Sequence, residues 1–378
     1  MNPISAVTHP DPYPFYAELV LERPLYFDEE LNLWVASSAE TVNAALHSDL
    51  CCVRPPAEPV PRVIQNSAMG EVFARLIRMN DGAKHCPFKH RVVSLEIGNG
   101  TRDDECAAFW AGRFAREVLN GTRDLQSFAF DLPAFVVGDL LGVPAASLPR
   151  IAVWTRDFVR GIALGADAET LERGHAATLG LLEVLRATLE RDAPGVLSAL
   201  ARGAHNSGTV LANGIGLLMQ SSDATAGLIG NALVRLRRHP ALLEDILYQP
   251  ALLPGFVAEI SRFEASIQNT RRFVAFNGVI AGRTMQSGDA ILVVLAAANR
   301  DPAVNPNPGR FDLTRANPRV FTFGAGLHGC PGKNLAETIA SAALEALLVH
   351  GFDLERIPCE VSYLPSLNAR IPRLTTLP

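Results

Sequence analysis

Hydrophobic residues recur at helical spacing along most of the chain. Apolar side chains three or four positions apart indicate amphipathic helices, and this spacing occurs in residues 71–78, 103–119, 125–141, 149–161, 168–191, 208–238 and 254–264. A further helix is predicted from Lys333 to about His350, where Gly351 provides a C-terminal stop. The pattern therefore predicts a protein made mostly of helices.

Runs with the composition of β-strands are few. Residues 25–27 and 33–36 flank the acidic segment Asp28-Glu29-Glu30 and predict a hairpin. The other candidate strands are residues 272–275, 279–281 and 290–294. Helices and strands do not alternate as they do in parallel βαβ folds, so we expect a mainly α protein with a small β portion.

The predicted helix at 208–238 is the longest, at roughly 45 Å for a rise of 1.5 Å per residue. It is apolar nearly all round before residue 220, so we expect it to lie in the middle of the protein. Its centre reads Gln220-Ser221-Ser222-Asp223-Ala224-Thr225. Because buried polar groups need hydrogen-bond partners, this segment predicts a kink or a functional site. The alternative is that Asp223 lies on the surface.

Composition narrows the class of protein. The 378 residues are 48% hydrophobic and 19% charged, with a formal net charge of −5, which disfavours a nucleic-acid-binding protein. The first ten residues lack the basic and apolar regions of a secretory signal, and no apolar stretch reaches the roughly 18 residues of a membrane span. Six scattered cysteines without CxxC spacing fit reduced thiols. We therefore expect a cytoplasmic protein without a membrane partner.

One cysteine stands in a chemically suggestive setting. Cys330 follows a glycine-rich run in the segment 323–332, FGAGLHGCPG, and a predicted helix begins directly after Gly332. The positive end of a helix dipole and its free N–H groups favour the thiolate, which is the form that binds metals. A buried free cysteine in a glycine-rich loop is the alternative.

This segment resembles the haem-ligand signature of cytochromes P450, Phe-x-x-Gly-x-(His/Arg)-x-Cys-x-Gly. The matching residues are Phe323, Gly326, His328, Cys330 and Gly332. The resemblance implies that Cys330 is the axial thiolate on the iron of haem b, iron protoporphyrin IX. It also implies a single domain over residues 1–378 with the P450 fold, a triangular helical prism around a long central helix.

The resemblance extends to groups that bind the two haem propionates, which need cations or hydrogen-bond donors. Lys89 stands where the family has arginine, so it keeps the charge but lacks the planar fork; Arg91 is the rival cation. The haem contacts implied by the resemblance are His85, Lys89, Arg272, Phe323, Gly324, His328, Cys330 and Gly332.

In the central helix the family has the pattern (Ala/Gly)-Gly-x-(Asp/Glu)-Thr-(Thr/Ser). Alignment places Asp223 at the acid and Ala224 at the catalytic threonine, where an alanine has no hydroxyl to relay protons. Thr225 lies about 100° further round the helix, so it would substitute only with a local bulge. Ser222, ordered water or a polar group of the substrate could also take the role of the missing hydroxyl.

Further positions follow from the same resemblance. Glu259 and Arg262 form an ExxR motif, which with Arg310 is expected to brace the cysteine loop; an ordinary salt bridge on a helix surface is the alternative. The candidate substrate contacts are Met219, Gln220, Ile267 and Gln268.

The implied function is that of a haem-thiolate oxidoreductase, a monooxygenase of the soluble bacterial type. It would oxidise a small or medium-sized organic molecule, such as a natural-product intermediate of secondary metabolism. We expect a monomer that receives electrons from ferredoxin and ferredoxin reductase, since the sequence contains no fused flavin or iron–sulfur domain. Two alternatives remain open: a P450 that works by peroxide use, oxidative coupling or rearrangement, and a non-enzymatic haem-based ligand-binding protein.

Overall fold

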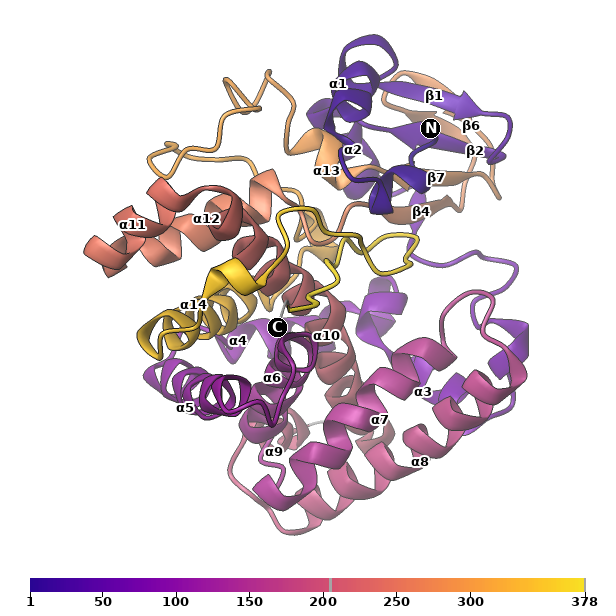
Figure 1. Cartoon of the computed structure of the whole chain (residues 1–378). Coiled ribbons are helices and arrows are strands. Elements are labelled where there is room, and N and C mark those ends of the chain that lie inside the picture. The colour runs from indigo at the N-terminus through magenta and orange to yellow at the C-terminus, as the bar shows by residue number, and fades with distance from the viewer. Residues whose placement is uncertain (204–205, 377–378) are drawn as a thin grey trace.

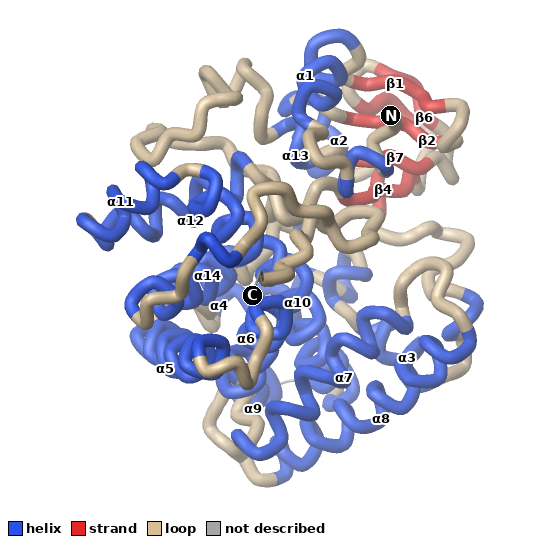
Figure 2. The backbone as a smooth tube through the Cα atoms, in the orientation of Figure 1, coloured by secondary structure: helices blue, strands red, loops and turns tan. Residues whose placement is uncertain are grey.

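A computed structural model describes residues 1–203 and 206–376 of the chain. Most of these residues are helical, and the strands gather at one end of the molecule (Figures 1 and 2). The described α-helices are α1 Tyr13–Glu22, α2 Ala39–His47, α3 Ala68–Arg75, α4 Cys86–Ser94, α5 Thr101–Leu119, α6 Leu125–Leu140, α7 Leu148–Gly161, α8 Ala168–Glu190, α9 Val196–Ala201, α10 Ser207–Arg238, α11 Pro240–Tyr248, α12 Leu253–Phe263, α13 Leu295–Ala298 and α14 Lys333–Val349.

The β portion is small and joins distant parts of the chain. Its main sheet has the order β1-β2-β7-β4-β3, in which β2 and β7 are parallel and the other neighbours antiparallel. The predicted hairpin is confirmed, with Leu25 of β1 opposite Ala36 of β2. Strands β5 and β6 form a separate antiparallel pair. The described strands are β1 Leu25–Asp28, β2 Leu33–Ala36, β3 Cys51–Cys52, β4 Thr270–Val274, β5 Gly278–Ile280, β6 Arg283–Met285 and β7 Ala290–Val293.

Helix α10 crosses the centre of the molecule (Figure 1). It is 32 residues long, and α3, α6, α7, α8, α9, α12 and α14 all pack against it. Residues 210–216 are buried without exception, so this part of the helix presents no polar face to water. The prediction of a buried central helix is confirmed. Within its polar segment, Ser222 and Thr225 are buried, whereas Gln220, Ser221 and Asp223 are partly exposed. Across residues 1–203 and 206–376, no helix combines the length and hydrophobicity that a membrane span requires.

Candidate functional site

A cavity of about 580 Å³ lies beside the middle of α10. Its lining includes α10, the region from residue 77 to 97, the segment from 266 to 273 around the start of β4, and the loop that leads into α14, together with residues of α6 and α14. Most of the accessible wall is apolar, with a few polar and basic side chains. Cavities of this kind are the usual sites for small molecules and cofactors.

Backbone hydrogen bonds shape the cysteine loop and direct Cys330 into the cavity. The N–H of Gly324 donates to Phe321 O at 2.7 Å, and the N–H of Cys330 donates to Phe323 O at 2.8 Å. Gly324 and Gly326 have φ angles of 69° and 66°, a left-handed conformation that favours glycine. Because α14 starts at Lys333, the sulfur of Cys330 lies at the N-terminal end of this helix, as predicted.

The environment of Cys330 suits a metal ligand better than a free nucleophile. Its side chain lies deep in the protein but keeps accessible surface, because it faces the cavity. Burial raises the pKa of the thiol, whereas a hydrogen bond from the Gly332 backbone and the charges of Lys89 and Arg78 oppose this rise. The backbone at the start of the helix therefore lowers the pKa of the thiol, as expected, but burial raises this pKa by more. A coordinating metal ion deprotonates a thiol outright, so a raised pKa is no obstacle to that role.

Basic side chains from distant segments meet beside the cysteine loop. The rings of His85 and His328 lie 4.3 Å apart, and His328 Nε2 is 2.9 Å from Asp81 Oδ1. Arg272 from β4 is almost fully buried, and all three basic residues line the cavity. Burial lowers the pKa of His85 to about 4, and the nearby charges of His328 and Lys89 add to this decrease. His85 is therefore neutral at pH 7 and can offer one ring N–H as a donor.

Lys89 and Arg91 of α4 are the two candidate cations for binding a propionate. Among the described residues that line the cavity, Lys89 is present and Arg91 is not. Lys89 Nζ donates to the carbonyl oxygen of Gly329 in the cysteine loop. Arg91 instead donates to the carbonyl oxygens of Arg202 and Gly203, on another part of the molecule. The structure therefore favours Lys89 as the cation of this helix.

Only some residues of the polar segment 220–225 of α10 face the cavity. Gln220, Ser221, Ala224 and Thr225 border the cavity. Thr225 borders the cavity although α10 is a continuous helix from Ser207 to Arg238. Its Oγ1 is buried and has no hydrogen-bond partner among the described residues, which leaves it free to bind a ligand or water.

Asp223 and Ser222 lie outside the cavity lining. Asp223 is partly buried, and burial raises the pKa of its carboxyl group, while the charge of Arg160 on α7 acts in the opposite direction. Ser222 is almost fully buried. The acid therefore lies between the core of α10 and a basic residue of α7, and the alternative of a fully exposed Asp223 is wrong.

The structure corrects two of the four candidate substrate contacts. Gln220 and Ile267 line the cavity, but Met219 is buried in the apolar core instead. Gln268 is fully buried and bonded within the protein: its Oε1 accepts from Tyr16 Oη at 2.8 Å, and its Nε2 donates to Ala265 O at 2.6 Å. Both polar atoms of the side-chain amide are used structurally, so Gln268 is not available to a ligand.

The ExxR motif is buried, so the surface alternative is excluded. Arg262 donates to Glu259 through two parallel bonds of 2.8 and 2.6 Å. The third arginine was assigned wrongly: the guanidinium that reaches Glu259 belongs to Arg315, at 3.3 Å, whereas Arg310 is exposed and contributes only its carbonyl oxygen to Arg262. Sequence spacing could not distinguish the two, because both lie on one irregular segment.

This cluster connects to the cysteine loop through α12. The hydroxyl of Thr322 donates to Ser261 O at 2.6 Å, and Asn299 Oδ1 accepts from the N–H of Phe321 at 2.5 Å. Residues 321 and 322 lead directly into Phe323, where the loop begins. The carbonyl of Asn299 also accepts from Arg262. The brace predicted for the ExxR motif therefore has a physical path to the loop.

Replacing Glu259 with alanine should destabilise the protein strongly. Arg262 would keep a buried charge without its partner, and breaking such a pair typically costs about 3–5 kcal/mol. Arg310→Ala is the matched control, because only its backbone bonds to Arg262. Chemical denaturation should show a large loss of unfolding free energy for Glu259→Ala and almost none for Arg310→Ala. Equal losses in both variants would contradict the geometry described above.

One basic residue of the cavity was missed by the sequence patterns. Arg78 lines the cavity from the turn Ile77–Met79, ahead of the predicted His85 and Lys89. Asn269 and Asn368 also border it.

Comparison with known proteins is consistent with this geometry. The profile of the family described as "Cytochrome P450" matches residues 195–363. The chain is 34% identical to cytochrome P450 monooxygenase PikC of Streptomyces venezuelae, over 97% of this chain and 90% of that protein. It is 31% identical to the 6-deoxyerythronolide B hydroxylase of Saccharopolyspora erythraea, over 90% of this chain and 88% of the hydroxylase.

Solved structures have the same fold. The crystal structure of CalO2 matches with a TM-score of 0.83 and 25% identity, covering 96% of this chain and 94% of CalO2. P450BioI, solved in complex with an acyl carrier protein that bears hexadec-9Z-enoic acid, matches with a TM-score of 0.81 and 24% identity, covering 96% of each chain. The helical architecture around α10 is thus shared over nearly the whole chain.

Proposed function

The chain belongs to the cytochrome P450 family of monooxygenases, and from this premise we propose that it holds haem b on Cys330 and oxidises a natural-product intermediate. The observation that carries the proposal is the position of Cys330, which faces a cavity from the N-terminal end of α14. In such a site the haem supplies the activation of dioxygen, with one oxygen atom passing to the product and the other to water.

The donors around the cavity fit this cofactor. Cys330 offers one soft thiolate ligand for the iron, and the mainly apolar wall suits a flat porphyrin. Arg272, Lys89, His85 and His328 offer the cations and N–H donors that two propionates need. Phe323, Gly324 and Gly332 also line the wall beside Cys330.

The residues of α10 would control the movement of protons to the reaction. Ala224 borders the cavity without a polar group, while the next residue, Thr225, has a buried hydroxyl that is not bonded to the described residues. We assign Thr225 the task of holding water or a substrate hydroxyl. Asp223, whose pKa is raised by burial, would exchange protons between this water and the Arg160 side of α10, with Ser222 beside it.

The substrate proposal rests on the cavity and on the relatives. Gln220, Asn269 and Asn368 add polar groups to an apolar wall, which suits a molecule that combines an apolar skeleton with hydroxyl or carbonyl groups. Two similar proteins are named for such substrates, the 6-deoxyerythronolide B hydroxylase and the 20-oxo-5-O-mycaminosyltylactone 23-monooxygenase of Streptomyces fradiae. We propose ferredoxin and ferredoxin reductase as the electron donors.

The test is oxygen incorporation with the reconstituted electron-transfer chain. Candidate macrolactones and related intermediates are first screened for a substrate-induced shift of the Soret band. Binders are then incubated with NADPH, ferredoxin and its reductase under ¹⁸O₂. We expect a product that is heavier by one ¹⁸O atom, and turnover that stops without ferredoxin.

Ala224 supports one second candidate, peroxide-dependent oxidation. An enzyme that receives its oxygen from peroxide needs no proton relay to activate dioxygen, so the loss of the threonine hydroxyl would matter less. Under this alternative, label from H₂¹⁸O₂ enters the product, and NADPH with ferredoxin supports no turnover. The two labelling experiments therefore give opposite results for the two candidates.

A further inference from the structure

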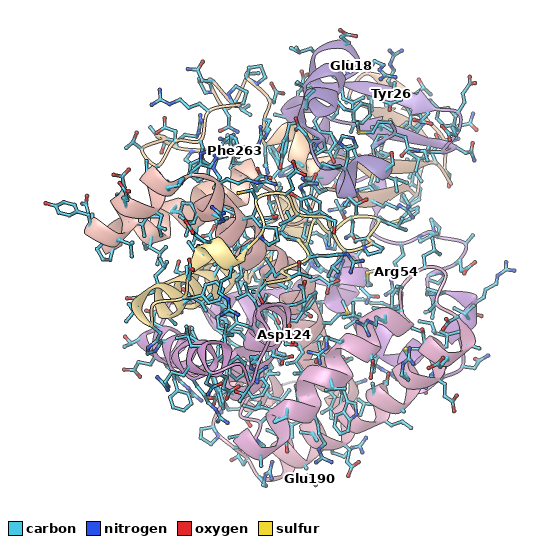
Figure 3. The ribbon with its side chains drawn as sticks, in the orientation of Figure 1. Glu18, Tyr26, Arg54, Asp124, Glu190 and Phe263 are labelled. Atoms are coloured by element: carbon cyan, nitrogen blue, oxygen red, sulfur yellow. The ribbon has the colours of Figure 1, made fainter. Side chains whose placement is uncertain are left out.

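Asn269 is a buried residue at the wall of the cavity, and only half of its side-chain amide is bonded. It belongs to the segment 266–269, which follows α12; Phe263, the last residue of this helix, is labelled in Figure 3. Only 4% of Asn269 is exposed, and the residue lines the cavity. Its Nδ2 donates to Leu367 O at 2.9 Å, whereas residues 1–203 and 206–376 provide no donor for its Oδ1. This oxygen keeps accessible surface in a residue that is otherwise enclosed, so it faces the cavity.

The contact with Leu367 fixes which way round the amide lies. The nitrogen and the oxygen of an asparagine side chain have almost the same shape, so only their hydrogen-bond partners distinguish them. A backbone carbonyl oxygen can accept but not donate, so the atom of Asn269 beside Leu367 O is the nitrogen. The atom left for the cavity is therefore an acceptor.

The backbone around this contact is held in place. The N–H of Gln268 donates to Asn368 O, and the N–H of Arg370 donates to Ser266 O, both at 2.8 Å. These bonds join the two segments as a short antiparallel ladder. The position of Asn269 at the cavity wall is thus set by the fold.

Two neutral side chains of α10 show the same hydrogen-bond pattern. Gln220 donates from Nε2 to Gly216 O, and the hydroxyl of Ser221 donates to Leu218 O, both at 2.8 Å. Both residues line the cavity. The carbonyl groups of their own helix take their donors, so their oxygen atoms remain as acceptors for a ligand.

The donors of the cavity are different groups. Charged donors such as Lys89 and Arg272 lie beside the cysteine loop, where the proposed function uses them for the haem. The Thr225 hydroxyl can donate or accept, and Asn368 is exposed, so water competes for its amide. A hydroxyl or N–H group of a ligand can bond to Asn269. A carbonyl or ether oxygen would instead place two acceptors against each other and leave both unpaired.

We propose that Asn269 accepts a hydrogen bond from a hydroxyl group of the substrate and thereby selects a hydroxylated molecule over the ketone or ether with the same skeleton. A buried acceptor without a partner keeps its full desolvation cost, and a site that bonds a hydroxyl group discriminates strongly against an analogue without one. The inference rests on the proposed function and narrows it, because it specifies which polar group the apolar skeleton carries. Gln220 and Ser221 offer acceptors for further hydroxyl groups.

The experiment uses the haem-loaded full chain and a series of paired imidazoles. Each pair consists of a 1-(ω-hydroxyalkyl)imidazole and its methyl ether, and the length of the alkyl chain increases along the series. The imidazole nitrogen binds the iron and shifts the Soret band, so an optical titration gives the Kd of each compound. The readout is the ratio of the two Kd values in one pair, compared between parent and variant. Differences in the hydrophobicity of the tails cancel in this comparison.

Three variants change Asn269, and a fourth is the control. Asn269→Leu and Asn269→Ala remove the acceptor. Asn269→Asp keeps an oxygen towards the cavity, and burial favours the protonated carboxyl group, whose O–H can still donate to Leu367 O. The control is Asn231→Leu, because Asn231 is also a buried amide that donates to backbone carbonyl oxygens, those of Glu264 and Arg370, but it is not part of the cavity lining.

At the chain length that reaches Asn269, the preference for the alcohol over its ether should fall about ten-fold in Asn269→Leu and Asn269→Ala, as expected for one lost hydrogen bond. Either truncation suffices if the other yields no haem-loaded protein. Asn269→Asp and Asn231→Leu should keep the parental preference. A preference that both truncations leave unchanged at every chain length would mean that the oxygen binds only water, and the proposal would be wrong. An equal loss in Asn231→Leu would also overturn it, because the effect would then come from loosened packing.

Failure of the proposed function is recognised separately. All preparations are first examined as the dithionite-reduced, CO-treated protein and titrated with imidazole itself. A parent chain that gives neither the spectrum of a thiolate-ligated haem nor a Soret shift with imidazole would overturn the haem assignment and, with it, the inference that rests on it. A parent with both signals, combined with unchanged preferences in the truncated variants, would overturn the Asn269 site alone.

Discussion

Replacing Cys330 with serine is expected to abolish the red-shifted Soret band that the dithionite-reduced, CO-treated protein gives with a thiolate-ligated haem. The serine hydroxyl remains protonated at neutral pH and is a harder donor than sulfur, so it cannot replace the thiolate electronically. The change is nearly isosteric, and the hydrogen bonds of the loop use backbone atoms, so the loop itself should persist.

Cys359→Ser is the matched control for this experiment. Cys359 is exposed and lies outside the cysteine loop, and its carbonyl oxygen accepts a hydrogen bond from Arg238. This variant should keep the parental spectrum. A Cys330→Ser protein that retained the red-shifted band would show that another residue is the ligand.

The sequence predicts the helices that are long enough to show a periodic pattern of apolar residues. The helices between residues 101 and 263 that have long apolar stripes, such as α5, α6 and α8, were predicted within one or two residues of their ends. The short helices α2, α4, α9 and α11 were not predicted, because six to nine residues give too few turns for a periodic pattern. Strand β3 has only two residues and is defined by its pairing with β4, which no local pattern contains.

In the candidate site, too, residues that belong to a contiguous motif were predicted, and residues that depend on distant partners were not. The cysteine loop was predicted because its glycines, its cysteine and the following helix are contiguous. Arg315 could not be predicted, since it acquires its role from Glu259, which lies far away in sequence. Gln268 shows the opposite error: it stands near cavity residues, but Tyr16 from α1 takes its amide oxygen. Which polar groups remain free is decided by tertiary contacts, not by position in a motif.

The second large effect is expected at Asp223. Asp223→Asn keeps the shape of the side chain but cannot exchange a proton, so product formation should fall by about 10²–10⁴-fold, the usual contribution of acid–base groups. Burial raises the pKa of the native carboxyl group, and this shift favours the protonated form that can donate a proton. Product formed per NADPH should fall as well, since electrons would be consumed without oxidation of the substrate. Asp245→Asn, on the exposed face of α11, is the control.

Substitutions of the neighbouring residues show which group holds the relayed proton. If the Thr225 hydroxyl holds the water or substrate hydroxyl, Thr225→Val should reduce product per NADPH while substrate binding changes little, because the two side chains have the same shape.

Ala224→Thr would place a second hydroxyl beside the first and compete for the same water, so coupling should fall or stay level. A large gain in coupling for Ala224→Thr would mean that the native enzyme lacks a relay. An unchanged rate in Asp223→Asn would mean that this acid takes no part in it, and protons would then have to reach the cavity by a route independent of Asp223.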